Sequence, residues 1–135
     1  MGMYTIVMSF LWIFVTEIMF VSDFAHHTGL TYPEYLIAAP DFAEIYIITK
    51  KLIGFILLAD GIMIVLINQN SYRKGEKWSW YAILAGGGIS WSTFIIYKIY
   101  IGYIGYSMVT FVVGITLLII GLAVPAKEIL MRKTS

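Results

Sequence analysis

Two carboxylates inside long apolar runs are the first candidates for chemistry in this 135-residue sequence. Glu17 interrupts the run from Tyr4 to Val21, and Asp60 lies in an apolar stretch that ends near Asn68. An acid at the centre of a membrane helix costs about 2.5 kcal/mol or more, so each needs a partner or a function. Asp60 is interpreted either as a neutral carboxyl that donates a structural hydrogen bond or as one that exchanges a proton during transport or redox chemistry.

Counting residues along the expected helices predicts which side chains lie at the same depth as Glu17 and Asp60. At ~1.5 Å per residue, Glu17 lies about one turn from the level of Lys51 on an antiparallel helix, which predicts an ion pair. This pair is either structural or part of a proton-carrying, ion-binding or quinone-binding site. The same arithmetic places Asp60 at the depth of Trp12 and Thr116, whose indole N–H or hydroxyl could satisfy the carboxyl.

A third candidate lies in the polar segment after the first apolar run. Asp23, His26 and His27 fall within five residues, and Glu34 could join them, so a metal site is one hypothesis. Adjacent histidines point to different sides of a helix, and both could bind one ion only if this segment is irregular. The alternative is that the histidines face the membrane interface or a partner.

Several kinds of chemistry are excluded by inventory. The sequence has no cysteine, which excludes disulfides, thiolate nucleophiles and Cys-based zinc sites. It has no Ser-His-Asp arrangement, phosphate-binding loop or zinc-protease helix, which gives no support to a hydrolase or nucleotide-driven enzyme and favours a non-catalytic role. Any chemistry would use carboxylates, histidines, hydroxyls or a bound cofactor, whose identity the sequence leaves open. A net charge of +1 without a basic run gives no reason to expect nucleic-acid binding.

The composition indicates which elements must position these residues. The chain is 60% hydrophobic and 13% charged, with a mean hydropathy of +0.85, as expected of a membrane domain. We predict an all-α integral membrane four-helix bundle forming one domain over residues 1–135, with helices at about 4–21, 41–68, 78–98 and 104–124. Asp41, with Glu44 following, is the expected N-cap of the second helix, and Pro125 is expected to end the fourth.

Charge distribution predicts the orientation. Basic residues gather in the middle loop and the tail, at Arg73, Lys74, Lys77, Lys127, Arg132 and Lys133. The long loop between the first two helices carries acids and no Lys or Arg before Lys50. Both termini are therefore expected in the cytoplasm and the longer loop outside, in a multi-pass plasma-membrane protein.

Glycines predict close helix packing. They recur at heptad spacing on the second and fourth helices and cluster in the third, at Gly54, Gly61, Gly86, Gly87, Gly88, Gly114 and Gly121. Small residues let helix backbones approach closely in lipid, within one bundle or between subunits.

The segment from Tyr72 to Tyr81, YRKGEKWSWY, carries a family resemblance. A basic turn followed by a Trp-rich helix start resembles the DoxX-like small four-helix membrane proteins over about a third of the chain. The resemblance implies a four-helix fold and association with respiratory or redox membrane complexes, and it assigns no catalytic residue. An acid in the first helix also resembles the small multidrug-resistance exporters, although the residues around Glu17 and the long outer loop depart from that pattern.

Two functional hypotheses follow. The leading one is a small non-catalytic accessory or assembly subunit of a larger membrane complex, of the respiratory or oxidase type that the resemblance implies, with other subunits or further copies of this chain as partners. The alternative is a proton-coupled small-molecule transporter or ligand-binding four-helix bundle in which Asp60 and Glu17 titrate.

Overall fold

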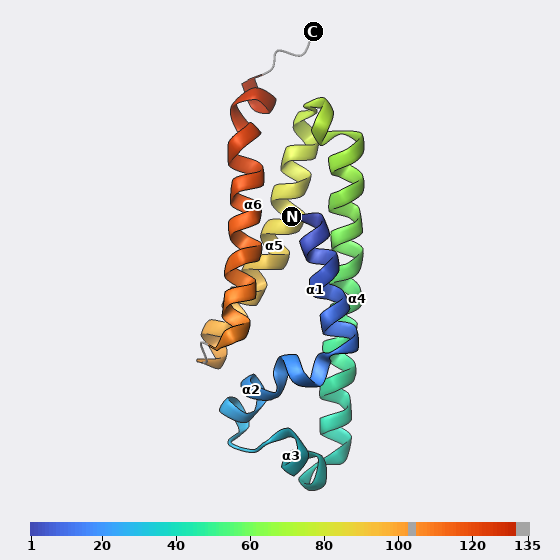
Figure 1. Cartoon of the computed structure of the whole chain (residues 1–135), viewed down its shortest axis with the longest axis vertical. Coiled ribbons are helices and arrows are strands. Elements are labelled where there is room, and N and C mark those ends of the chain that lie inside the picture. Colours follow the sequence, from blue (N-terminus) through green and yellow to red (C-terminus); the bar gives the residue numbers. More distant parts are fainter. Residues whose placement is uncertain (103–104, 132–135) are drawn as a thin grey trace.

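The computed structural model describes residues 1–102 and 105–131, without the side chains of residues 18–21, 106 and 107. Every regular element in these ranges is helical (Figure 1). The order is α1 (Gly2–Phe14), α2 (Thr16–Thr28), α3 (Tyr32–Ala38), α4 (Pro40–Asn70), η1 (Tyr72–Lys74), α5 (Lys77–Ile101) and α6 (Tyr106–Met131). Three of them, within Pro40–Lys74, Lys77–Ile101 and Met108–Met131, are long and apolar enough to cross a membrane.

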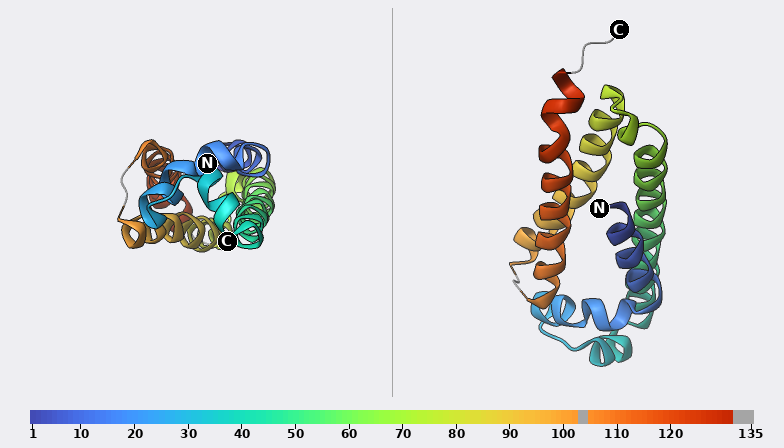
Figure 2. Two further views of the ribbon diagram at one scale, coloured as in Figure 1. Left: turned by 90° about the horizontal axis from the view of Figure 1, so that it is seen from below. Right: turned by 45° about the horizontal axis from the view of Figure 1, so that its top comes forward.

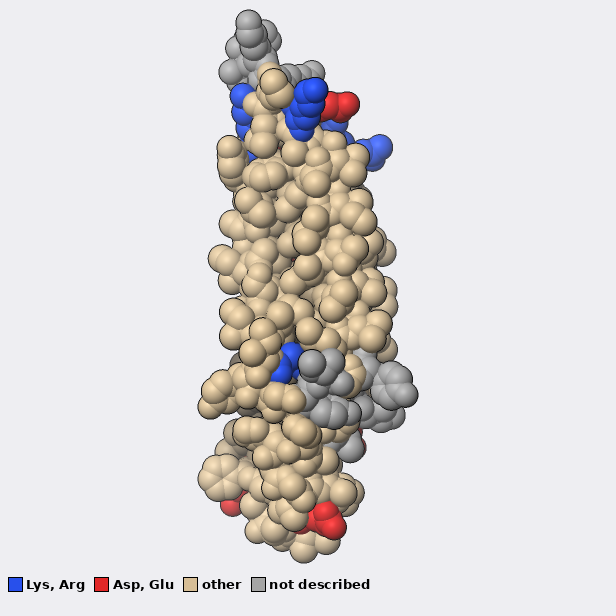
Figure 3. Space-filling view, turned by 90° about the vertical axis from the view of Figure 1, so that its left-hand side faces the viewer, with Lys and Arg blue, Asp and Glu red and all other residues tan. Residues whose placement is uncertain are grey.

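The three long helices and α1 lie side by side, and α2 and α3 close one end (Figures 1 and 2). We call this end the α3 end, and the opposite end, where η1 joins α4 to α5, the η1 end. On the face shown in Figure 3, most Lys and Arg residues gather at the η1 end, where an acidic side chain lies among them, and further acidic side chains lie at the α3 end. A broad band of mainly uncharged residues separates them, as a membrane-crossing surface requires.

The first apolar run is not one helix over 4–21 as the sequence predicted. Val15, at φ −120° and ψ 28°, breaks it. The Thr16 hydroxyl donates to the carbonyl of Trp12 at 2.5 Å, a local bond that competes with regular helix continuation. At ~1.5 Å per residue, the 13 residues of α1 span about 20 Å, which is less than the hydrocarbon core of a bilayer.

The segment predicted as a long outer loop is largely helical. α2 turns across the end of the bundle, and α3 begins with a capping box in which Thr31 and Glu34 bond reciprocally (Figure 1). Asp41 is not the N-cap of α4, because the helix already begins at Pro40, whose fixed φ suits the first helical turn.

Pro125 does not end the last helix, which continues to Met131. Proline lacks an N–H and therefore leaves the carbonyl four residues earlier, that of Gly121, without its helical donor. The hydroxyl of Tyr72 donates to this carbonyl at 2.5 Å. A side chain from the η1 turn thus satisfies the group that proline exposes, which allows α6 to continue.

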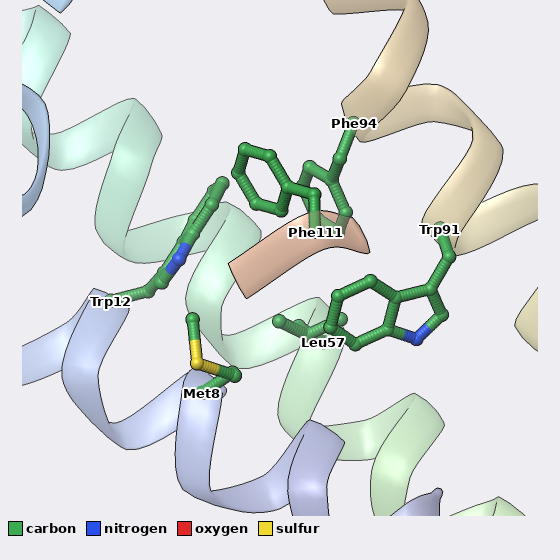
Figure 4. Close-up of a cluster of buried hydrophobic side chains, with 6 residues drawn as sticks. All are labelled: Met8, Trp12, Leu57, Trp91, Phe94 and Phe111. Atoms are coloured by element: carbon green, nitrogen blue, oxygen red, sulfur yellow. The ribbon is translucent and has the colours of Figure 1, made fainter. Parts of the chain in front are cut away.

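The main core lies where α1, α4, α5 and α6 meet. Six buried side chains fill it: Met8, Trp12, Leu57, Trp91, Phe94 and Phe111 (Figure 4). The rings of Phe94 and Phe111 stack with centroids 5.2 Å apart, and Trp12 meets Phe94 edge-on at 4.9 Å. These contacts fix α5 against α6 and α1 on the bundle side of the α3 end.

Candidate functional site

A buried ion pair joins α2 to α5. Both carboxylate oxygens of Asp23 accept hydrogen bonds from Lys98 Nζ, each at 2.5 Å. The two side chains are 0% and 1% exposed, and the ring of Phe111 lies beside the ammonium, 5.8 Å from Nζ to centroid. Removing two charges from water costs free energy that only close pairing offsets, so separating the two side chains is unfavourable and the pair holds α2 across the bundle end.

A second lysine lies near this pair, on α4. Lys50 is 7% exposed, and its Nζ donates to the Tyr97 hydroxyl at 3.0 Å. The ammonium also lies over two phenol rings, 4.2 Å from the centroid of Tyr97 and 5.2 Å from that of Tyr46. The hydroxyls of Tyr46 and Tyr97 are hydrogen-bonded to each other. Lysine, phenol hydroxyls and aromatic faces together form a polar cluster at the α3 end.

A crevice between α4 and α5 leads away from Lys50. Its volume is about 250 Å³. The residues that line it are Trp12, Lys50, Ile53, Ile56, Leu57, Ser90, Thr93, Phe94 and Tyr97. Ile56 and Thr93 are exposed, so the crevice opens on the outer surface of the bundle. It combines apolar walls with a few polar groups, of which the charged one, Lys50, lies at one end, a common composition for a small-molecule site.

Asp60 lies one turn beyond the crevice on α4. Its partner is the hydroxyl of Ser90, a crevice-lining residue, rather than Trp12 or Thr116. Its Oδ2 is buried and accepts no hydrogen bond from any residue in the described part of the chain. Thr116 lies exposed on α6 and donates to the Val112 carbonyl. Asp60 is therefore linked to the crevice through Ser90.

The predicted Glu17–Lys51 ion pair is not formed. Both side chains are exposed, and Lys98 with Asp23 is the ion pair found among the described residues. The break at Val15 places Glu17 in the first turn of α2, where the helix dipole favours an acid. With Glu44, Glu17 lies close enough to raise the pKa of Tyr32, although burial of the phenol is the larger cause.

The predicted metal ligands are not brought together. Asp23 faces the interior and Lys98, whereas His26 and His27 are exposed in the last turn of α2. Glu34 bonds Thr31 instead. No group of three metal-ligating side chains is found among the residues that the structure describes. Residues three and four apart are neighbours on a helix, so spacing alone would allow contact, but the Asp23 carboxylate is buried against Lys98 while both imidazoles are exposed.

The glycines fall into two groups. A Cβ atom would lie 2.9 Å or less from a neighbouring side chain at Gly54, Gly61, Gly87 and Gly114. These four allow α1 to approach α4, and α5 to approach α6. A Cβ on Gly86 would meet Asp60 at 3.4 Å, whereas none would meet an atom within 4 Å at Gly88 or Gly121.

Sequence reasoning did not identify Lys50, Lys98, Tyr97 or Ser90 as site residues. A signal was present, because a lysine within an apolar run needs an acidic or aromatic partner as much as an acid needs a basic one. Lys98 was instead interpreted as the end of its helix.

A second cavity, of about 300 Å³ at the η1 end, has mainly apolar walls that include Ile64, Ile83 and Leu118.

Comparison with known proteins adds no assignment. No family model, curated protein or solved structure matches this chain.

Proposed function

We propose that this chain is a multi-pass plasma-membrane protein with its η1 end in the cytoplasm. The support is the positive-inside rule: four exposed basic residues lie at that end, Arg73, Lys74, Lys77 and Lys127. The α3 end exposes the acidic residues Glu34, Asp41 and Glu44. α1 lies beside α4 where a fourth helix would be but is too short to cross, and α2 closes the α3 end (Figure 1).

Within that membrane, we propose that the protein binds a small amphipathic molecule in the crevice between α4 and α5. The observation that carries this proposal is the polar end formed by buried Lys50 and its partner Tyr97 in a crevice whose other walls are mainly apolar. Polar groups at such depth are costly unless they serve structure or a ligand, and these two line an opening to the surface. Asp60, hydrogen-bonded to Ser90 at the far end, is the proposed group that couples binding to a proton.

A crevice-filling variant tests this function. Thr93→Phe places an aromatic ring in the crevice, whereas Ser92→Phe adds the same ring on the neighbouring exposed residue that does not line it. Binding of radiolabelled dodecanoate, dodecanol and dodecylammonium is measured with the protein in phosphatidylcholine nanodiscs, with empty nanodiscs as background. We expect saturable binding of at least one amphiphile that Thr93→Phe abolishes and Ser92→Phe retains. Absence of saturable binding for all three would refute the function.

A second candidate is an accessory subunit of a membrane complex, of the respiratory or oxidase type that the DoxX-like resemblance implies. The observation in its favour is the open space at Gly88 on α5 and Gly121 on α6, next to exposed apolar side chains. Purification from the host in mild detergent, followed by mass spectrometry, is expected to show a partner in fixed ratio. Gly88→Leu should remove that partner, and elution of the wild-type chain alone would contradict this candidate.

A further inference from the structure

Resting on the proposed function, we propose that the ligand is a single-chain amphiphile with a carboxylate head, such as a fatty acid. Its carboxylate binds Lys50 Nζ and the Tyr97 hydroxyl, and its alkyl chain lies along the crevice toward Leu57. Four features of the site argue for this class of ligand: its charge, its hydrogen-bond donors, its shape and the state of the hydroxyl groups on its opposite wall.

The charge argument concerns the buried ionisable groups at the α3 end. Among the buried residues that the structure describes, two are lysines, Lys50 and Lys98, and one is a carboxylate, Asp23. Asp23 directs both oxygens at Lys98, and its one negative charge also acts on Lys50. A ligand carboxylate at Lys50 would bring the cluster to two cations and two anions, the balance that a buried cluster favours. A cationic head would add a third positive charge and is disfavoured.

The donor geometry also suits a carboxylate. The Lys50 ammonium has three N–H donors, and the adjacent Tyr97 hydroxyl carries a further donor. Both line the same end of the crevice. A carboxylate has two oxygens that can accept from both residues at once, and such charge-assisted hydrogen bonds are stronger than those to a neutral hydroxyl.

The shape argument concerns the rest of the crevice. On α4, its lining runs from Lys50 to Leu57, about 10 Å along the helix. Ile53, Ile56 and Leu57 provide an apolar wall. A cavity of about 250 Å³ accommodates one alkyl chain with a compact head, whereas a phospholipid brings two chains and a larger head.

The hydroxyls on the opposite wall are already engaged. Thr93 donates to the carbonyl of Ile89 on its own helix at 2.8 Å, and Ser90 bonds Asp60. A threonine whose hydroxyl bonds its own helix makes no demand on a ligand for hydrogen bonding. The middle of the crevice therefore suits an alkyl chain, and the polar recognition is confined to the Lys50 end.

The test compares three probes with the same chain and different heads: dodecanoate, dodecanol and dodecylammonium. In nanodiscs of wild-type protein, we expect dodecanoate to bind about tenfold or more tighter than dodecanol, and dodecylammonium to bind weakest. Lys50→Met keeps an apolar side chain of similar length and should remove the preference for dodecanoate. Lys51→Met, a change of the adjacent exposed lysine, is the matched control and should retain the preference.

Tyr97→Phe provides a second variant that does not depend on replacing a buried charge. It removes only the hydroxyl and should weaken dodecanoate binding about threefold to tenfold while leaving dodecanol binding nearly unchanged. Equal binding of dodecanoate and dodecanol to the wild-type protein, with both lost in Thr93→Phe, would overturn the carboxylate assignment and leave the crevice function standing. Failure of all three probes would instead refute the proposed function itself.

Discussion

Removing one member of the Asp23–Lys98 pair should destabilise the fold more than removing both. In Asp23→Leu, the ammonium of Lys98 stays in a site that is 1% exposed but loses the carboxylate that accepts two of its hydrogen bonds. Uncompensated burial of a charge costs about 3–5 kcal/mol. Lys98→Met leaves the carboxylate of Asp23 buried and should cost a similar amount.

The double variant, Asp23→Leu with Lys98→Met, should lose less stability than either single variant. Apolar side chains of similar volume often replace a buried ion pair at little cost, because the desolvation of both charges is removed together with their attraction. The expected coupling free energy in the double-mutant cycle is therefore about 3 kcal/mol or more, beyond the ordinary range for neighbouring residues.

Unfolding by sodium dodecyl sulfate in mixed micelles, followed by circular dichroism, measures these free energies. Lys51→Met is the control, since an exposed lysine at a similar level should change the free energy of unfolding by about 0.5 kcal/mol or less. If the two single effects are each below about 1 kcal/mol, or simply add in the double variant, the pair does not hold α2 in the way we argue.

Two further predictions concern packing and pH. Gly114→Ala should destabilise the protein by about 1–3 kcal/mol in the same unfolding assay, because its Cβ would lie 2.1 Å from the ring of Trp91. Gly121→Ala is the control: a Cβ there would meet no atom within 4 Å, so this change should be neutral or slightly stabilising. The backbone N–H and the hydroxyl of Thr31 donate to the Glu34 carboxylate and lower its pKa in the folded protein. The ionised carboxylate therefore stabilises α3 fully at pH values above the pKa that Glu34 has in the unfolded chain. This stabilisation is lost as the pH falls through the lower pKa of the folded protein. Hydrogen exchange of the α3 amides should accelerate in that acidic window, and a pH dependence that persists in Glu34→Gln would contradict the assignment to this carboxylate.

Local patterns in the sequence were enough to establish the helical class and the approximate position of the long helices. The predicted spans 41–68, 78–98 and 104–124 correspond to α4, α5 and α6, because long apolar runs between polar turns allow few other structures in a membrane. The boundary at Pro125 was wrong because the hydroxyl that satisfies the Gly121 carbonyl belongs to Tyr72, 49 residues earlier in the chain.

The candidate site depended on tertiary structure. Counting residues along straight helices paired Glu17 with Lys51, but the break at Val15 turns α2 across the bundle and brings Asp23 to Lys98 instead. A hydrophobicity pattern records which residues are apolar, and it does not record the direction of a helix after a break. The sequence by itself determined the helical, membrane-compatible character of this protein and its asymmetry of charge. Only the tertiary structure decided which buried charges meet, because ion pairing at membrane depth depends on contacts between segments that are far apart in the chain.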